Sequence, residues 1–354
     1  MITMSTKKAK TGIKLPKFIG NSAAKIHAAT NRFLARRPHR SFRRTRRRDY
    51  ARSLKLPGYW SFSAYTIKTL LNHKKTFLLL ALTYAVLTIL MVGMASQNNF
   101  TALTSTLTQT SGDIFKGNWG QLGQSSLLFL TIISGGISQN LTEGQQIYAT
   151  IITLLTWLTT VWLLRNIMAG KRVKLSDGIY NAGAPILPTF LVGLVLVVQL
   201  LPVALVLIGY SAASVTGLLS NGVEAMLFWI VAGLLVVLSL YWITSTIIAL
   251  VVVTLPGMYP YRAIRTAGDL VIGRRLRIMV RLLWMVLSGF ISWVIVMLPV
   301  ILLVTWLNSL WPALQGVPII PIVIVALSSL TIVWAASYVY LLYRKVVADD
   351  ADPA

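Results

Sequence analysis

Residues 187–210 read LPTFLVGLVLVVQLLPVALVLIGY, a stretch without one charged side chain. About 20 apolar residues in an α-helix cross a hydrocarbon core about 30 Å thick, so this stretch is long enough to span a membrane. Five other segments of the chain are equally long and apolar. The six predicted spans are 76–96, 147–168, 187–210, 225–255, 278–307 and 319–343. The sequence therefore predicts an all-α fold, a polytopic integral membrane bundle of six transmembrane helices.

Composition supports this fold class and excludes several kinds of site. The chain has 354 residues, 56% hydrophobic and 12% charged, whereas soluble domains carry about 25% charged residues. There is no Cys, so thiolate metal sites and a Cys nucleophile are excluded. The three histidines, His27, His39 and His73, all precede the first predicted span. We therefore expect no metal site and no cofactor.

The distribution of basic residues orients the predicted spans. With six spans, every Lys and Arg except Lys116 lies on one side, which the positive-inside rule assigns to the cytoplasm. The short apolar segment 127–133 is a candidate seventh span, but counting it would move Lys171, Arg172 and Lys174 outside. We therefore predict six spans with both termini cytoplasmic. Segment 127–133 is expected to be an interfacial or re-entrant helix within the outer loop, 97–146.

The chain divides into four predicted regions. Residues 1–55 are rich in Lys and Arg with one acid, Asp49, and are expected to form a largely disordered cytoplasmic arm. Residues 56–75 combine aromatic and basic side chains and predict an amphipathic helix in the membrane interface. The transmembrane domain covers 76–346, and its first span is expected to be an uncleaved anchor. Residues 347–354 form a short acidic cytoplasmic tail.

Four arginines precede the fifth span. Arg274, Arg277 and Arg281 are spaced i, i+3 and i+7 on one face of a predicted helix, with Arg275 beside them. One hypothesis is a site for anionic phospholipid headgroups, because guanidinium binds phosphate in a bidentate manner. The alternative is that these arginines only orient and anchor the span. The sequence leaves both open.

Prolines mark two further features. Pro202 and Pro299 lie inside spans and predict helix kinks. They also permit broken helices whose backbone groups contact a substrate, as in some transporters. Pro256 and Pro260 delimit a predicted cytoplasmic turn.

Two polar side chains, one inside and one just before a predicted span, have structural explanations. Gln199 is expected to form a hydrogen bond between helices. Glu224 is expected to be a solvated helix start.

A weak internal similarity accompanies the span prolines. Residues 178–183 and 263–268 each precede a span that contains Leu-Pro-Val. The two units would be parallel repeats, although chance similarity in Ala, Gly and Leu is the alternative.

No catalytic pattern is present. The chain lacks a phosphate-binding loop, a Ser-His-Asp set and paired carboxylates, and no acid lies in mid-span. The favoured hypothesis is a non-catalytic membrane protein that contacts anionic lipid and scaffolds an envelope partner. One alternative is a transporter or lipid permease. Another is a membrane tether for nucleic acid or ribosomes through residues 1–55, although few aromatic residues there could stack on bases.

Two segments carry a family resemblance. Residues 170–178, GKRVKLSDG, and the stretch from Pro260 through Ala263 and Ala267 to Arg274 resemble the membrane domain of glycerophosphoryl diester phosphodiesterases. They also resemble related six-span envelope proteins of bacteria. The resemblance covers about 59–346, and the basic arm departs from it. In that family the activity belongs to an attached soluble barrel, which this chain lacks. The resemblance therefore implies a stand-alone, non-catalytic protein of the bacterial cytoplasmic membrane.

Overall fold

The computed structural model describes residues 56–92, 142–217, 219, 222–311 and 319–351. Every structural statement below concerns these residues, which lie in one compact unit. The predicted disorder of the arm, the candidate segment 127–133 and most of the outer loop lie outside them.

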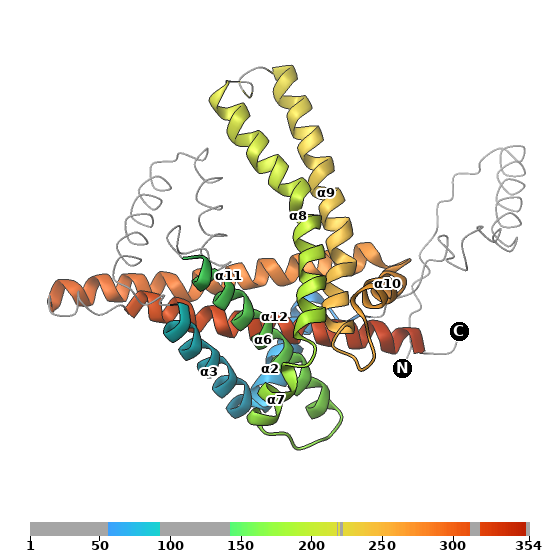
Figure 1. Cartoon of the computed structure of the whole chain (residues 1–354). Coiled ribbons are helices and arrows are strands. Elements are labelled where there is room, and N and C mark those ends of the chain that lie inside the picture. The colour runs from blue at the N-terminus through green and yellow to red at the C-terminus, as the bar shows by residue number, and fades with distance from the viewer. Residues whose placement is uncertain (1–55, 93–141, 218, 220–221, 312–318, 352–354) are drawn as a thin grey trace, which may run out of the picture. The chain divides into compact units, whose positions relative to one another are not determined.

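Nine helices and no strand make up the described chain (Figure 1). Six of the helices are long and apolar enough to cross a membrane, and each coincides with a predicted span. These six are α3 (Lys74–Val92), α6 (Glu143–Met168), α8 (Ile186–Val215), α9 (Gly222–Val252), α11 (Arg275–Leu310) and α12 (Ile319–Ala351). The predicted all-α class is therefore confirmed for the described residues, and all six predicted spans have a matching helix among them.

Three short helices each precede one of the long helices. They are α2 (Tyr59–Asn72) before α3, α7 (Leu175–Ala182) before α8, and α10 (Pro260–Val271) before α11. The start of α10 follows from local chemistry. Gly257 adopts a positive φ of 72° in the turn after α9, and Pro260 occupies the first turn of α10, where a missing N–H costs nothing.

Helix α12 extends beyond its predicted end. The sequence places the end of the span at Tyr343 and an acidic tail from 347, whereas the helix continues to Ala351. Packing accounts for the difference, because Val346 is completely buried in the main hydrophobic core. The first part of the predicted tail is therefore helical.

The main core lies where α3, α6 and α12 contact one another. Tyr84 of α3 and Thr159 of α6 share a hydrogen bond of 2.8 Å inside this core. The last turn of α9 joins the same core, as do Ala263 and Ala267 on one face of α10. Helices α8 and α9 run side by side as a hairpin (Figure 1), and most of their apolar side chains are exposed.

Helix α7 approaches α6 closely at a glycine. A Cβ atom at Gly178 would lie 3.0 Å from Cδ2 of Leu163 and 3.2 Å from Cγ2 of Thr159. These distances are shorter than most Cβ contacts, so a larger side chain at position 178 would force Leu163 or Thr159 to move.

Gly178→Leu should therefore destabilise the protein by about 3 kcal/mol, the upper end of the cost of overpacking. Gly144→Leu is the matched control, because a Cβ at this helical glycine meets no atom within 4 Å. Thermal unfolding in detergent measures both. Equal Tm values for the two variants would contradict the close approach of α7.

Candidate anionic-lipid site

The four predicted arginines lie where α10 leads into α11. Gly273 has a positive φ of 79°, and Arg274 is the residue that precedes the first turn of α11. This tight connection brings the basic residues of α10 and the start of α11 into one stretch of chain.

The structure separates the four arginines by exposure. Arg277 is exposed and Arg275 is half-buried, whereas Arg274 and Arg281 are only 2% and 6% exposed. The expectation of a single basic face open to lipid therefore does not describe Arg274 and Arg281. Their side chains are engaged by the protein, and Nε of Arg274 donates to the carbonyl of Leu270 at 2.9 Å.

Arg275 contacts an aromatic ring. Its guanidinium lies 3.8 Å from the ring centroid of Tyr241, so the start of α11 is attached to the middle of α9 by a cation–π contact. The Arg275 residue as a whole stays half-buried.

Arg281 holds the beginning of α2. Its guanidinium donates to the carbonyl of Pro57 and, at 3.4 Å, to the carbonyl of Gly58. It also lies 4.5 Å from the ring centroid of Tyr59 and 5.6 Å from that of Phe62. The planar fork of arginine suits this double donation, which a lysine ammonium cannot reproduce in the same geometry.

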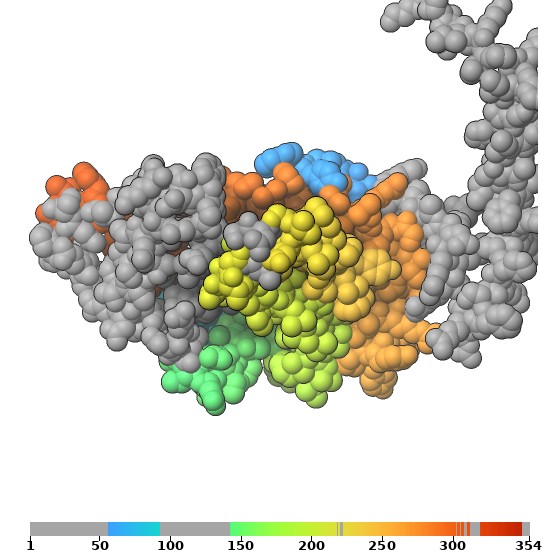
Figure 2. All heavy atoms as spheres, turned by 90° about the horizontal axis from the view of Figure 1, so that it is seen from above, coloured from blue at the N-terminus to red at the C-terminus, as the bar shows by residue number. Residues whose placement is uncertain are grey.

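Aromatic side chains complete this contact. Trp284 donates to the hydroxyl of Ser63 at 3.1 Å and packs edge-on against Trp60 at 4.8 Å. Tyr338 of α12 packs edge-on against Phe62, also at 4.8 Å. We call Arg281, Trp284 and Tyr338 the α2 clamp. Figure 2 shows α2, in blue, beside the orange of α11.

The sequence predicted α2 as an amphipathic helix but not its partners. Helices α11 and α12 contact α2, which buries Phe62, Ser63 and Thr66, whereas apolar side chains such as Trp60 and Leu71 stay exposed. The run of aromatics after Pro57 was the available signal, since such side chains commonly pack on arginine or on one another.

The face of α10 opposite its buried alanines is basic and aromatic. Arg262 and Arg265 are exposed there, and Tyr261 is 77% exposed. Tyr259, immediately before the helix, is 74% exposed. We call these four residues the α10 face. Arginine with tyrosine is the combination expected at phospholipid headgroups.

A further arginine was not predicted to have a structural role. Nη1 of Arg165, near the end of α6, donates to the carbonyl of Thr254 at 2.9 Å. This carbonyl follows the last turn of α9, where helix carbonyls lack partners within the helix. Arg165 thus fastens α6 to the end of α9.

The predicted hydrogen bond of Gln199 is confirmed. Thr246 of α9 donates to Oε1 of Gln199 at 2.7 Å, and Ser239 of α9 donates to the Gln199 carbonyl. This carbonyl lies about one turn before Pro202, so a donor from α9 reaches α8 close to the place where proline removes a helical hydrogen bond. Helices α8 and α11 continue through Pro202 and Pro299 without interruption.

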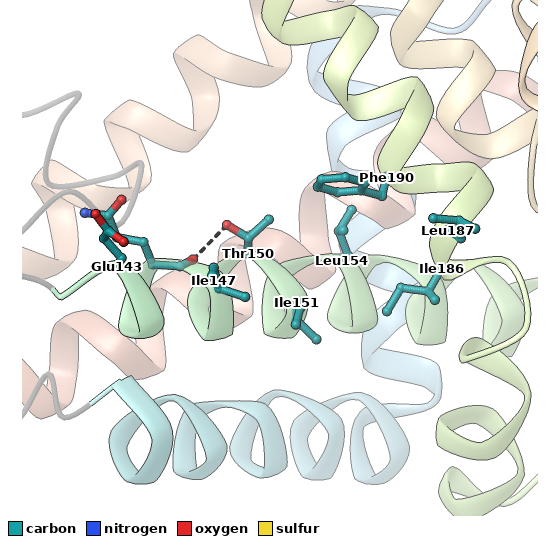
Figure 3. Close-up of a pocket in the computed structure, with 9 residues that line it drawn as sticks. Glu143, Ile147, Thr150, Ile151, Leu154, Ile186, Leu187 and Phe190 are labelled. Carbon is teal, nitrogen blue, oxygen red and sulfur yellow. Dashed lines mark hydrogen bonds between the residues drawn. The ribbon is translucent and has the colours of Figure 1, made fainter.

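A cavity of about 550 Å³ lies between α6 and α8. Figure 3 shows Leu154 of α6 and Phe190 of α8 on its two sides, with Glu143 at one end. Apart from Thr150, the side chains between its two ends are apolar. No group of three His, Asp or Glu in the described ranges could hold a metal ion.

These helices define a multi-pass α-helical membrane protein. No protein-family model, no curated protein and no solved structure matches the chain. The function must therefore be argued from the residues of the chain.

Arg281→Lys tests the α2 clamp. The substitution keeps the positive charge but loses the fork that reaches two carbonyls, so we expect a loss of about 2 kcal/mol, typical of hydrogen bonds to charged groups. Arg277→Lys, one turn away on an exposed side chain, should leave stability unchanged. The measurement is thermal unfolding in lipid nanodiscs, and an unchanged Tm for Arg281→Lys would contradict the clamp.

Proposed function

We propose that this chain is a non-catalytic protein of the bacterial cytoplasmic membrane that binds anionic phospholipid headgroups through the α10 face and Arg277. The proposal rests mainly on one observation, that α10 has one buried face and one exposed basic and aromatic face. Its alanines are buried against the core, and its arginines and tyrosines point away from it.

The chemistry of this face suits a phosphate-bearing surface. Guanidinium groups donate in pairs to phosphate oxygens, and each basic residue near an anionic surface contributes about 1 kcal/mol. Tyr259 and Tyr261 have the amphipathic rings that settle at headgroup depth. The formal net charge of +24 also favours anionic lipid, because a strongly basic protein attracts negatively charged headgroups.

The burial of Arg274 and Arg281 reduces the set of arginines that lipid can reach. These two side chains contact other parts of the protein. In the proposal, the lipid therefore contacts Arg262, Arg265 and Arg277, and in part Arg275. In this proposal both termini and α10 lie on the cytoplasmic side, as the positive-inside rule and the resemblance to bacterial six-span proteins indicate. The proposal also includes that the protein scaffolds a partner protein of the bacterial envelope.

The described residues bear differently on the two alternatives. The transporter or permease hypothesis drew on broken helices at Pro202 and Pro299, and both helices are continuous. The nucleic-acid tether rests on residues 1–55, outside the described residues, and stays a prediction.

Arg262→Gln, Arg265→Gln and Arg277→Gln combined should weaken retention of phosphatidylglycerol at least tenfold, given about 1 kcal/mol for each charge. Native mass spectrometry of the purified protein measures retention. The matched control combines Lys171→Gln, Arg172→Gln and Lys174→Gln, which removes the same charge from exposed positions before α7. If both triple variants lost retention of phosphatidylglycerol equally, general charge attraction would explain the binding and the α10 site would be contradicted.

A further inference from the structure

The cavity between α6 and α8 has the form of a site for an amphiphile. Its volume of about 550 Å³ falls within the range of about 300–1,000 Å³ common for small-molecule sites. Its length is lined by aliphatic and aromatic side chains of two candidate membrane spans: Ile147, Ile151, Leu154, Ile186, Leu187 and Phe190. A hydrocarbon chain fits this lining, whereas a polar solute would lose its hydration there.

The polar groups of the cavity gather at one end (Figure 3). Glu143 and Gln146 lie in the first turns of α6, whereas Leu154 lies at the opposite end beside α8. With a helical rise of about 1.5 Å per residue, Glu143 and Leu154 are about 16 Å apart along α6. The hydroxyl of Thr150, between them, already donates to the carbonyl of Gln146 at 2.8 Å. A headgroup at Glu143 and an acyl chain directed toward Leu154 would match this polarity.

The role of Glu143 is not explained by helix capping. The capping box of α6 uses two other residues: Thr142 Oγ1 accepts from the backbone N–H of Gln145, and Gln145 Oε1 accepts from the backbone N–H of Thr142. Glu143 still gains from the positive end of the helix dipole, as a first-turn acid does. Glu143 is nevertheless exposed at one end of an apolar cavity.

The sign of this charge selects the headgroup. The chain has only 9 acidic residues against 33 basic ones, so a carboxylate at a cavity mouth is unusual for it. A carboxylate repels a headgroup of net negative charge and pairs with an ammonium group that carries N–H donors. The preference is therefore opposite to that of the α10 face.

We propose that the cavity between α6 and α8 binds an acyl chain of an ethanolamine-type phospholipid, with the headgroup ammonium paired to Glu143. This site goes beyond the proposed function, because it takes a different lipid class at a different place in the fold. Its failure would leave the α10 face untouched.

The test uses the full chain and three probes with identical acyl chains: phosphatidylethanolamine, phosphatidylcholine and phosphatidylglycerol. Native mass spectrometry counts the lipids retained after delipidation. The unaltered protein should keep one phosphatidylethanolamine in preference to the other two. Glu143→Gln should reduce that preference about twofold to fivefold, the range that exposed ion pairs produce. Glu224→Gln, which alters another first-turn glutamate at the start of α9, is the matched control and should change nothing.

A second variant tests the apolar part of the site. Ile151→Trp fills the cavity and should abolish retention of the preferred lipid, and adding Glu143→Gln to it should then have no further effect. Thermal unfolding checks that Ile151→Trp is folded, and if it is not, Ile151→Phe replaces it. Equal retention of the three lipids by the unaltered protein would overturn the proposal. So would retention unchanged by Glu143→Gln, or retention unchanged by filling the cavity, because another occupant or surface would then account for it.

Discussion

The fold depends on one constraint: polar groups in apolar surroundings must find partners within the protein. Continuous helices satisfy the backbone, and the hydroxyl side chains of the core follow the same rule. Thr66, Thr156, Thr160 and Ser337 are buried, and each donates to the carbonyl four residues earlier in its own helix at 2.7–3.0 Å. Such residues tolerate burial without a partner from another helix, so they do not by themselves mark a polar pathway through the bundle.

Three long-range polar contacts have a different role, since they join helices near their ends or beside a proline. Arg165 holds the end of α9, Arg281 holds the beginning of α2, and Gln199 links α8 to α9. Both arginines use backbone carbonyls as acceptors. This choice fits the chain's composition, because few carboxylates are available to pair with so many basic residues. Buried arginine therefore acts as a structural connector, and only part of the basic surface is available for lipid.

Two surfaces with opposite charge follow from these contacts. The α10 face presents arginine and tyrosine outward because small alanines let its other side pack closely on the core. The cavity between α6 and α8 presents a single carboxylate at the end of an apolar lining. In the two proposals the first surface binds phosphate and the second binds ammonium, so one protein would contact two classes of lipid by simple electrostatics. Neither contact requires a catalytic group.

Apolar length alone determined the six long helices, because a segment such as 187–210 has no other way to satisfy its backbone and its side chains. The bond of Gln199 was predictable for the same reason, as a lone amide in an apolar helix needs a neighbour. The burial of Arg274 and Arg281, the clamp on α2 and the extension of α12 past Tyr343 were decided by tertiary packing. Helical spacing reports which residues share a face, but not which helix covers it. Arg281 and Gly58 are separated by 223 positions, and only the folded chain brings them together.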